Sequence, residues 1–158
     1  MFFDIILSGI SIGSIYAMLA VSVVIILKTT GVANFAQGEL AMFSTFITYS
    51  LLVEKEFPSF LALVLTLIFA GIMGIVIQHI IIRPLLSSPI ISTLIATLGL
   101  NLIIHSIAGM IWGYQTNIMP SLFKDFGSLT VGKVIIPMEN IILIIVPLVL
   151  LSGFMLFL

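Results

Sequence analysis

Residues 5–27 read IILSGISIGSIYAMLAVSVVIIL, and no charged side chain occurs between Asp4 and Lys28. A helix needs roughly 20 consecutive apolar residues to cross a bilayer, so this stretch predicts a transmembrane helix. The whole chain is similar in character, because 61% of its 158 residues are hydrophobic and only 7% are charged. So few charges cannot cover a globular surface, which excludes a soluble enzyme and a basic nucleic-acid-binding protein.

Charge gaps and turn residues predict four further spans. Three consecutive charged residues, Glu54-Lys55-Glu56, end the second apolar stretch. Pro84 is expected to end the third by forcing Arg83 out of the helical region of backbone angles. We therefore expect an all-α, polytopic bundle of about five transmembrane helices, forming one domain over residues 1–158 and surrounded by membrane lipid. The predicted spans are residues 5–27, 35–53, 60–82, 90–112 and 140–158.

The loop between the last two spans has a pattern of its own. Residues 129–137 alternate weakly between apolar and polar side chains around Gly132, which predicts a small β-hairpin.

Small residues recur at helical spacing on three of the spans. Such residues let membrane helices approach closely, so the sequence predicts that these helices are buried against other helices. The positions concerned are Gly9, Gly13 and Ala17 on the first span, Gly74 on the third and Gly109 on the fourth.

The fourth span carries a polar ladder of Thr93, Thr97, Asn101 and His105 at intervals of four residues. Each interval advances about 400°, so the stripe drifts around the helix. Two interpretations remain open: the ladder supplies hydrogen bonds between helices, or it lines a translocation pathway.

Glu39 is the one acidic residue within a predicted span. An acid in a membrane helix costs roughly 2.5–3.5 kcal/mol at the helix centre and suggests a function. Asn34 and Gln37, however, have the spacing of a capping box, which would place Glu39 in the second turn near the positive end of the helix dipole. A structural role at a helix start and a role in the pathway or its gating both remain open.

Two motifs look enzymatic but lack their usual context. Gly9–Gly13 matches G-x-S-x-G inside a predicted membrane helix, and Gly127–Lys133 resembles a P-loop without the final Ser or Thr. His79 and His105 are too far apart for a metal-binding motif, and the chain has no cysteine. The sequence thus predicts neither an enzyme nor a bound metal or cofactor.

Several of these stretches together resemble the permease subunit of branched-chain amino acid ABC transporters. The resemblance covers about residues 5–145, and its most specific part is the hexapeptide NFAQGE. The matching stretches are Gly9–Ala17, Asn34–Glu39, Arg83–Leu85, Ile95–Leu100 and Trp112-Gly113.

This resemblance implies a multi-pass importer subunit in the bacterial cytoplasmic (inner) membrane. The implied partners are a second, similar permease, cytoplasmic ATPase subunits and an extracytoplasmic solute-binding protein. Asn34, Gln37, Gly38 and Glu39 occupy the family signature and would mark a helix start near the pathway. Gln37 stands where many members have histidine, so a titratable role at that position is lost.

Permeases of that family continue past the fifth span into a basic loop that contacts the ATPase. The resemblance therefore leaves two functional expectations. The first is a subunit that translocates branched-chain or similar small amino acids while partner subunits hydrolyse ATP. The second is a truncated, non-transporting scaffold or remnant.

Overall fold

A computed structural model describes residues 2–120, 122, 128–131 and 134–157 of the chain. The protein is an all-α membrane protein with one short hairpin, as its composition predicted. Its residues form two compact units, one of residues 1–24 with 121–158 and one of residues 25–120. The long helix α1 (Phe2–Thr30) contributes to both.

Three helices in the described part of the chain are long and apolar enough to cross a membrane. They cover Ser8–Thr30, Ser59–Leu85 and Ile90–Trp112. The helical run at residues 37–54 is not among these three, and α6 contains a shorter apolar stretch, Asn140–Phe154.

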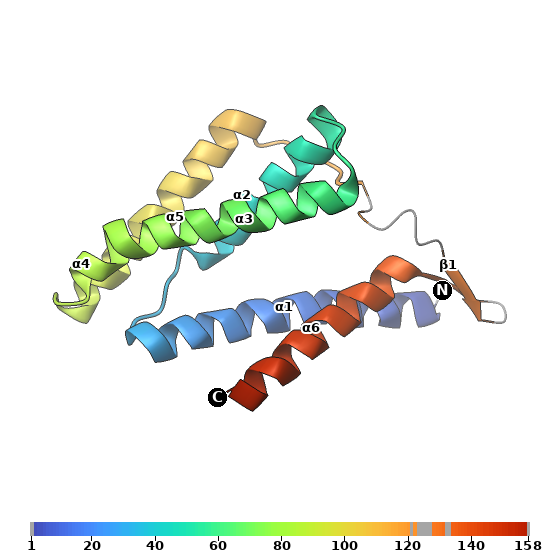
Figure 1. The fold of residues 1–158 in the computed structure, drawn as a ribbon, viewed down its shortest axis with the longest axis horizontal. Helices are drawn as coiled ribbons and strands as arrows, with labels where there is room; N and C mark the ends of the chain where they lie inside the picture. The colour runs from blue at the N-terminus through green and yellow to red at the C-terminus, as the bar shows by residue number, and fades with distance from the viewer. Residues whose placement is uncertain (1, 121, 123–127, 132–133, 158) are drawn as a thin grey trace. The chain divides into compact units, whose positions relative to one another are not determined.

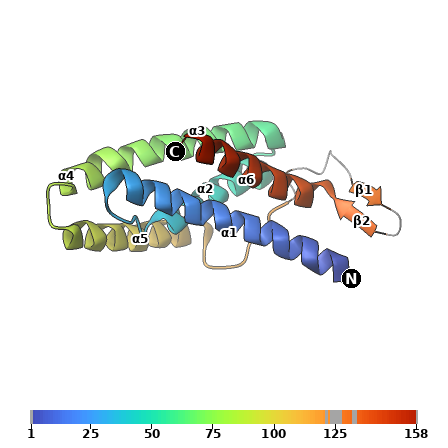
Figure 2. The same cartoon turned by 90° about the horizontal axis from the view of Figure 1, so that it is seen from below.

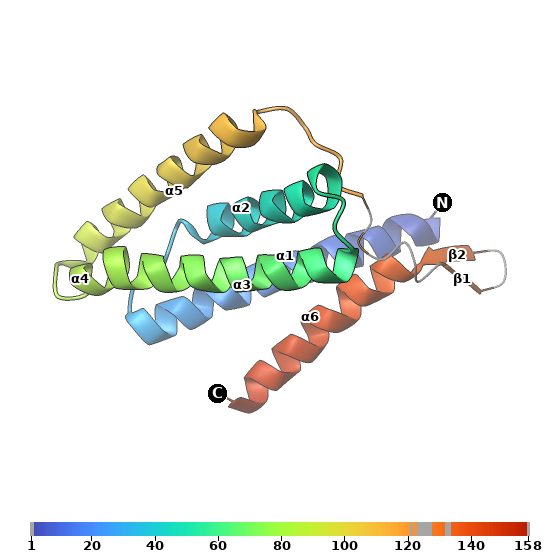
Figure 3. The same cartoon turned by 45° about the horizontal axis from the view of Figure 1, so that its top comes forward.

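The larger unit is built around α2 (Gln37–Tyr49), which lies between α3 (Ser59–Ile77) and α5 (Ile90–Trp112) and packs against both (Figures 1 and 3). Its small buried core consists of Ala36, Ile77, Ile82, Leu100 and Ile104. Most other large aliphatic side chains on α3 and α5 are exposed, as expected of helices whose solvent is lipid.

Two five-residue π-helices interrupt the regular helices, η1 (Ser50–Glu54) after α2 and η2 (Gln78–Ile82) after α3. The expectation that Pro84 would force Arg83 out of the helical region is wrong. Arg83 has helical angles (φ −56°, ψ −44°) and starts the short helix α4 (Arg83–Leu85), with Pro84 in its first turn. Proline needs no N–H partner there, and the wider π turn before it relieves the clash of its ring with the preceding turn.

The smaller unit contains the predicted hairpin. Strands β1 (Ser128–Val131) and β2 (Val134–Pro137) pair antiparallel, and β2 runs directly into α6 (Met138–Phe157) (Figure 2). The Ser11 hydroxyl of α1 donates to the Asn140 carbonyl of α6 across 3.4 Å. Because α1 runs from Phe2 to Thr30, Ser11 lies within a helix and not on the strand-to-helix turn that a G-x-S-x-G nucleophile requires. Of the P-loop-like stretch, residues 128–131 form β1, and Gly127, Gly132 and Lys133 lie outside the described residues.

Candidate functional site: a polar seam between α2 and α5

The connection between α1 and α2, residues 31–36, is irregular, and three of its six residues are buried. Val32, Asn34 and Ala36 are 9%, 6% and 0% exposed. Backbone polar groups in such a place need partners, and side chains supply several of them. The Thr30 hydroxyl donates to the Val32 carbonyl over 3.0 Å, and the Ala36 N–H donates to the Asn34 side-chain oxygen over 3.0 Å.

The predicted capping box at Asn34 and Gln37 is not formed. Asn34 closes a turn ahead of the helix, the N-cap position belongs to Ala36, and α2 begins at Gln37. The Gln37 N–H donates to the Asn34 carbonyl at 3.4 Å. Because the turn occupies residues 35 and 36, Glu39 lies in the first turn of α2 and not in the second. That position is still near the positive end of the helix dipole.

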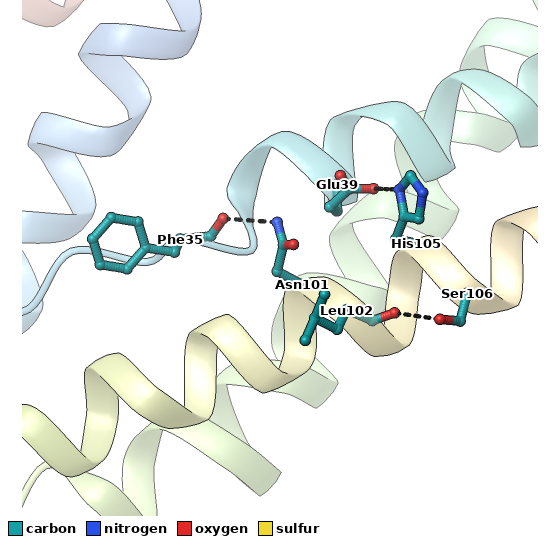
Figure 4. A network of polar contacts seen from close by, with 6 residues as sticks. All are labelled: Phe35, Glu39, Asn101, Leu102, His105 and Ser106. Atoms are coloured by element: carbon teal, nitrogen blue, oxygen red, sulfur yellow. Dashed lines mark hydrogen bonds and ion pairs between the residues drawn. The ribbon is translucent and has the colours of Figure 1, made fainter.

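The start of α2 lies beside the middle of α5. The Asn101 amide, at the midpoint of α5 (residues 90–112), donates to the Phe35 carbonyl across 3.3 Å (Figure 4). Eleven residues of α5 lie on each side of Asn101, which corresponds to about 16 Å of helix. Asn101 therefore supplies a partner for a backbone carbonyl of the irregular connection, beside the midpoint of a helix long and apolar enough to cross a membrane.

Glu39 and His105 form the one ion pair that the described side chains contain. The Glu39 Oε2 atom lies 3.2 Å from His105 Nδ1, and the two side chains are 21% and 52% exposed (Figure 4). A carboxylate only accepts hydrogen bonds, so Nδ1 carries the proton in this contact. Gly38, next to Glu39, is exposed in the same turn. We call Asn34, Phe35, Glu39, Asn101 and His105 the polar seam.

The polar ladder of α5 is divided between two environments. Thr93 and Thr97 are only 2% and 1% exposed, and their hydroxyls donate to the carbonyls of Leu85 and Leu94. Asn101 and His105 instead reach the irregular connection and α2. Each four-residue step exceeds a full helical turn by about 40°. The three steps from Thr93 to His105 therefore rotate the stripe by roughly 120°, from the interior to the exposed side of the unit. The structure thus brings Asn101 and His105 together with Glu39, and it keeps Thr97 inside the packed unit.

The predicted packing glycines have little packed against them within the described residues. A Cβ added at Gly9, Gly13 or Gly74 would meet no atom within 4 Å, and Ala17 is half-buried. A Cβ at Gly109 would overlap the ring of Tyr114, so this glycine accommodates a side chain and not a helix. A role of these positions in helix association stays a prediction.

Sequence reasoning missed the aromatic cluster where α2 and α5 end. The Trp112 ring stacks on Phe46 at 5.1 Å and meets Phe43 edge-on at 5.3 Å. Its Nε1–H donates to the Ser50 hydroxyl over 2.6 Å. The i, i+3 spacing of Phe43 and Phe46 indicates one helix face. The partnership with Trp112, more than 60 residues away, has no local signal in the sequence.

Hollows adjoin α2 in the larger unit. One of about 350 Å³ lies between the end of α1, the irregular connection and α3, with Thr30, Asn34 and Gly74 in its lining. A second, of about 170 Å³, is lined by His105 and Tyr114 among others, and a third, of about 400 Å³, lies between α2 and residues 115–119. The described residues contain no group of three or more Asp, Glu or His side chains that would suit a metal ion.

Comparison with known proteins identifies relatives of one kind. The chain is 24% identical over 161 residues to the high-affinity branched-chain amino acid transport system permease protein BraD of Pseudomonas aeruginosa. This match covers 95% of the chain and 52% of BraD. It is 24% identical to LivH of Salmonella typhimurium and 23% identical to LivH of Escherichia coli, permease proteins of the same kind. Each LivH match covers 125 residues, which are 74% of this chain and 41% of LivH.

The chain spans about half the length of the curated relatives that it matches. No solved structure matches it. The family described as "Branched-chain amino acid transport system / permease component" matches residues 5–158. This match covers nearly the whole chain and shows that the protein belongs to that permease family.

Proposed function

We propose that the chain is a permease subunit of an ABC importer for branched-chain or similar small amino acids. In this proposal partner subunits hydrolyse the ATP, and the chain itself carries no catalytic group. The names of BraD and LivH support the substrate class, because they are permease proteins of high-affinity branched-chain amino acid transport systems.

The observation that carries the proposal is the polar seam. Irregular backbone at membrane depth occurs only where it is buried in protein or lines a water-filled cavity. Here the connection at residues 31–36 ends beside the middle of α5, and the helix that starts there holds Glu39 against His105. Transporters use such interrupted helices to place helix ends and polar side chains at the substrate pathway.

The exposure of the ion pair supports a pathway more than a purely structural role. Half of the His105 side chain is exposed in the larger unit, and lipid would be a poor solvent for an ionisable side chain on a membrane-spanning helix. A pathway formed with a second permease would give this face water and substrate as neighbours. The remaining partners of the proposed complex are the ATPase subunits and an extracytoplasmic solute-binding protein, in the bacterial cytoplasmic membrane.

Uptake by intact cells tests this proposal. Deleting the gene should abolish high-affinity uptake of labelled leucine, and restoring the complete gene should return it. The complete protein, purified in a mild detergent, should retain an ATPase subunit. Unchanged leucine, isoleucine and valine uptake after deletion, with no ATPase retained, would contradict the proposal and favour a non-transporting scaffold.

A further inference from the structure

One face of α2 changes from charged to apolar along its length. Glu39, Met42, Phe46 and Tyr49 follow one another at intervals of three and four residues, so they lie on one side of the helix. Glu39 begins this series at the polar seam, and the other three side chains extend toward the end of α2. A ligand lying along this face would meet a carboxylate first and an apolar wall next.

Two of the hollows adjoin along this same face. The hollow of about 170 Å³ is lined by His105 and Tyr114, and the hollow of about 400 Å³ by Tyr49 and Asn117. Both are also lined by Met42, Phe46 and Gln115, so they are neighbours, and we call the two together the groove. The larger hollow has a volume within the usual range for small-molecule sites, roughly 300–1,000 Å³.

Groups in the groove and beside it suit each part of an amino acid. Glu39 does not line the two hollows, but it contacts His105, which lines the smaller one. Among the described residues, Glu39 bonds to His105 through its Oε2 atom. Its Oε1 atom can accept a hydrogen bond from an ammonium group. His105 lies beside it, in the lining of the smaller hollow. Met42 and Phe46 give the larger hollow flexible and flat apolar surfaces, suited to a branched aliphatic side chain.

Part of the wall is fixed before any ligand enters. Phe46 stacks on Trp112, and Trp112 is held by its hydrogen bond to Ser50. A prepositioned wall lowers the entropy that binding would cost. Met42, by contrast, has three rotatable bonds and can adapt to side chains of slightly different shape.

We propose that this groove binds the transported amino acid, with the ammonium group at Glu39 and the aliphatic side chain in the hollow beside Met42 and Phe46. The inference rests on the proposed function and adds to it a location for the substrate and a residue, Met42, that selects for side-chain size.

Substrate protection of a single cysteine tests the location, because the native chain contains no cysteine. Met42→Cys is introduced into the complete protein, in native membranes with its partner subunits, and labelled with a small thiol reagent. Leucine at about ten times its Kd should slow labelling about tenfold, since only the unoccupied fraction reacts. Asn117→Cys, on the opposite wall, should show the same protection if Met42→Cys fails to assemble.

Ile118→Cys is the matched control for this experiment. Ile118 is 87% exposed and does not line the groove, although it adjoins Asn117. Leucine should leave its labelling unchanged. Equal labelling of Met42→Cys and Asn117→Cys with and without leucine, in membranes that transport leucine, would overturn the site and leave the proposed function standing. A wild-type system that neither binds nor transports leucine would overturn both.

Selectivity tests the role of Met42. Met42→Phe narrows the hollow and should lower the uptake ratio of leucine to alanine about tenfold, the usual effect of crowding an apolar pocket. Met110→Phe makes the same change at a side chain that is 84% exposed on α5 and away from the groove. A leucine-to-alanine ratio that stays at the wild-type value in Met42→Phe, with uptake retained, would overturn this role.

Discussion

The two connections that flank α2 are similar in length and opposite in character. Residues 31–36 precede the helix with buried positions at Val32, Asn34 and Ala36, whereas residues 55–58 follow η1 and are all exposed. The first connection contains no charged residue, and the second contains Lys55 and Glu56. Glu56 even adopts a positive φ of 54°, a strained conformation for a residue other than glycine.

The difference shows what a chain needs when its backbone leaves a helix at positions buried in protein. At residues 55–58 solvent can satisfy the backbone, and only turn residues are required. At residues 31–36 the side chains of Thr30, Asn34 and Asn101 satisfy specific backbone groups. The buried connection is therefore dictated by long-range contacts, and it places Glu39 beside His105.

The largest effect on stability is expected at Asn34. Asn34→Leu removes the acceptor of the buried Ala36 N–H and should cost about 1–3 kcal/mol of unfolding free energy. Unfolding in mixed detergent micelles would measure this. A loss no greater than that of a substitution at exposed Lys55 would contradict the distinction between the two connections.

The charge of Glu39 is expected to matter for transport more than for folding. Glu39→Gln keeps the shape and a hydrogen-bond acceptor for His105 but removes the negative charge. Leucine uptake should fall about tenfold at low substrate concentration, equivalent to about 1.4 kcal/mol, while the amount of assembled transporter stays the same. Uptake equal to wild type at matched protein levels would leave only a structural role for this carboxylate.

Asn101 is expected to have a smaller structural effect than Asn34. Asn101→Leu removes the donor to the Phe35 carbonyl, a bond of 3.3 Å at a half-buried site. Interhelical hydrogen bonds in membrane proteins average about 0.6 kcal/mol, and we expect a loss of that order. The same detergent unfolding assay would show it, and a loss larger than that of Asn34→Leu would reverse the predicted order.

The smallest effect is expected in the exposed connection. Lys55→Ala should change the unfolding free energy by no more than about 0.5 kcal/mol, as is usual for surface positions. Leucine uptake should also remain at the wild-type level. A large loss of either would mean that this connection is not the surface turn that its exposure indicates.

The sequence predicted the helices well because charge gaps and turn residues are local signals. A hairpin at residues 129–137 was also predicted, from alternation around Gly132, and strands β1 and β2 pair there. Helix starts were less accurate: the residues of a capping box are present at Asn34 and Gln37, but the chain uses Asn34 for a turn. The π-helices at Ser50–Glu54 and Gln78–Ile82 have no recognisable sequence pattern.

The polar seam was predictable only in parts. Glu39 was singled out by its cost in a membrane helix, and Asn101 and His105 by their spacing. Their contacts join residues 66 positions apart, so no periodicity within one helix could pair them. The drift of the ladder was foreseen, but which end would be buried depends on the packing of α5 against α2 and α4.

The most direct test of the central claim is whether water reaches the start of α2. Gly38→Cys, in an otherwise cysteine-free chain, adds a side chain that meets no atom within 4 Å. Ile103→Cys is the control, because Ile103 is 57% exposed near the middle of α5 and about 200° around the helix from Asn101. In intact membranes of the complete transporter, a charged thiol reagent should label Gly38→Cys readily and Ile103→Cys hardly at all. Labelling of neither cysteine, or equal labelling of both, would contradict a water-accessible polar seam.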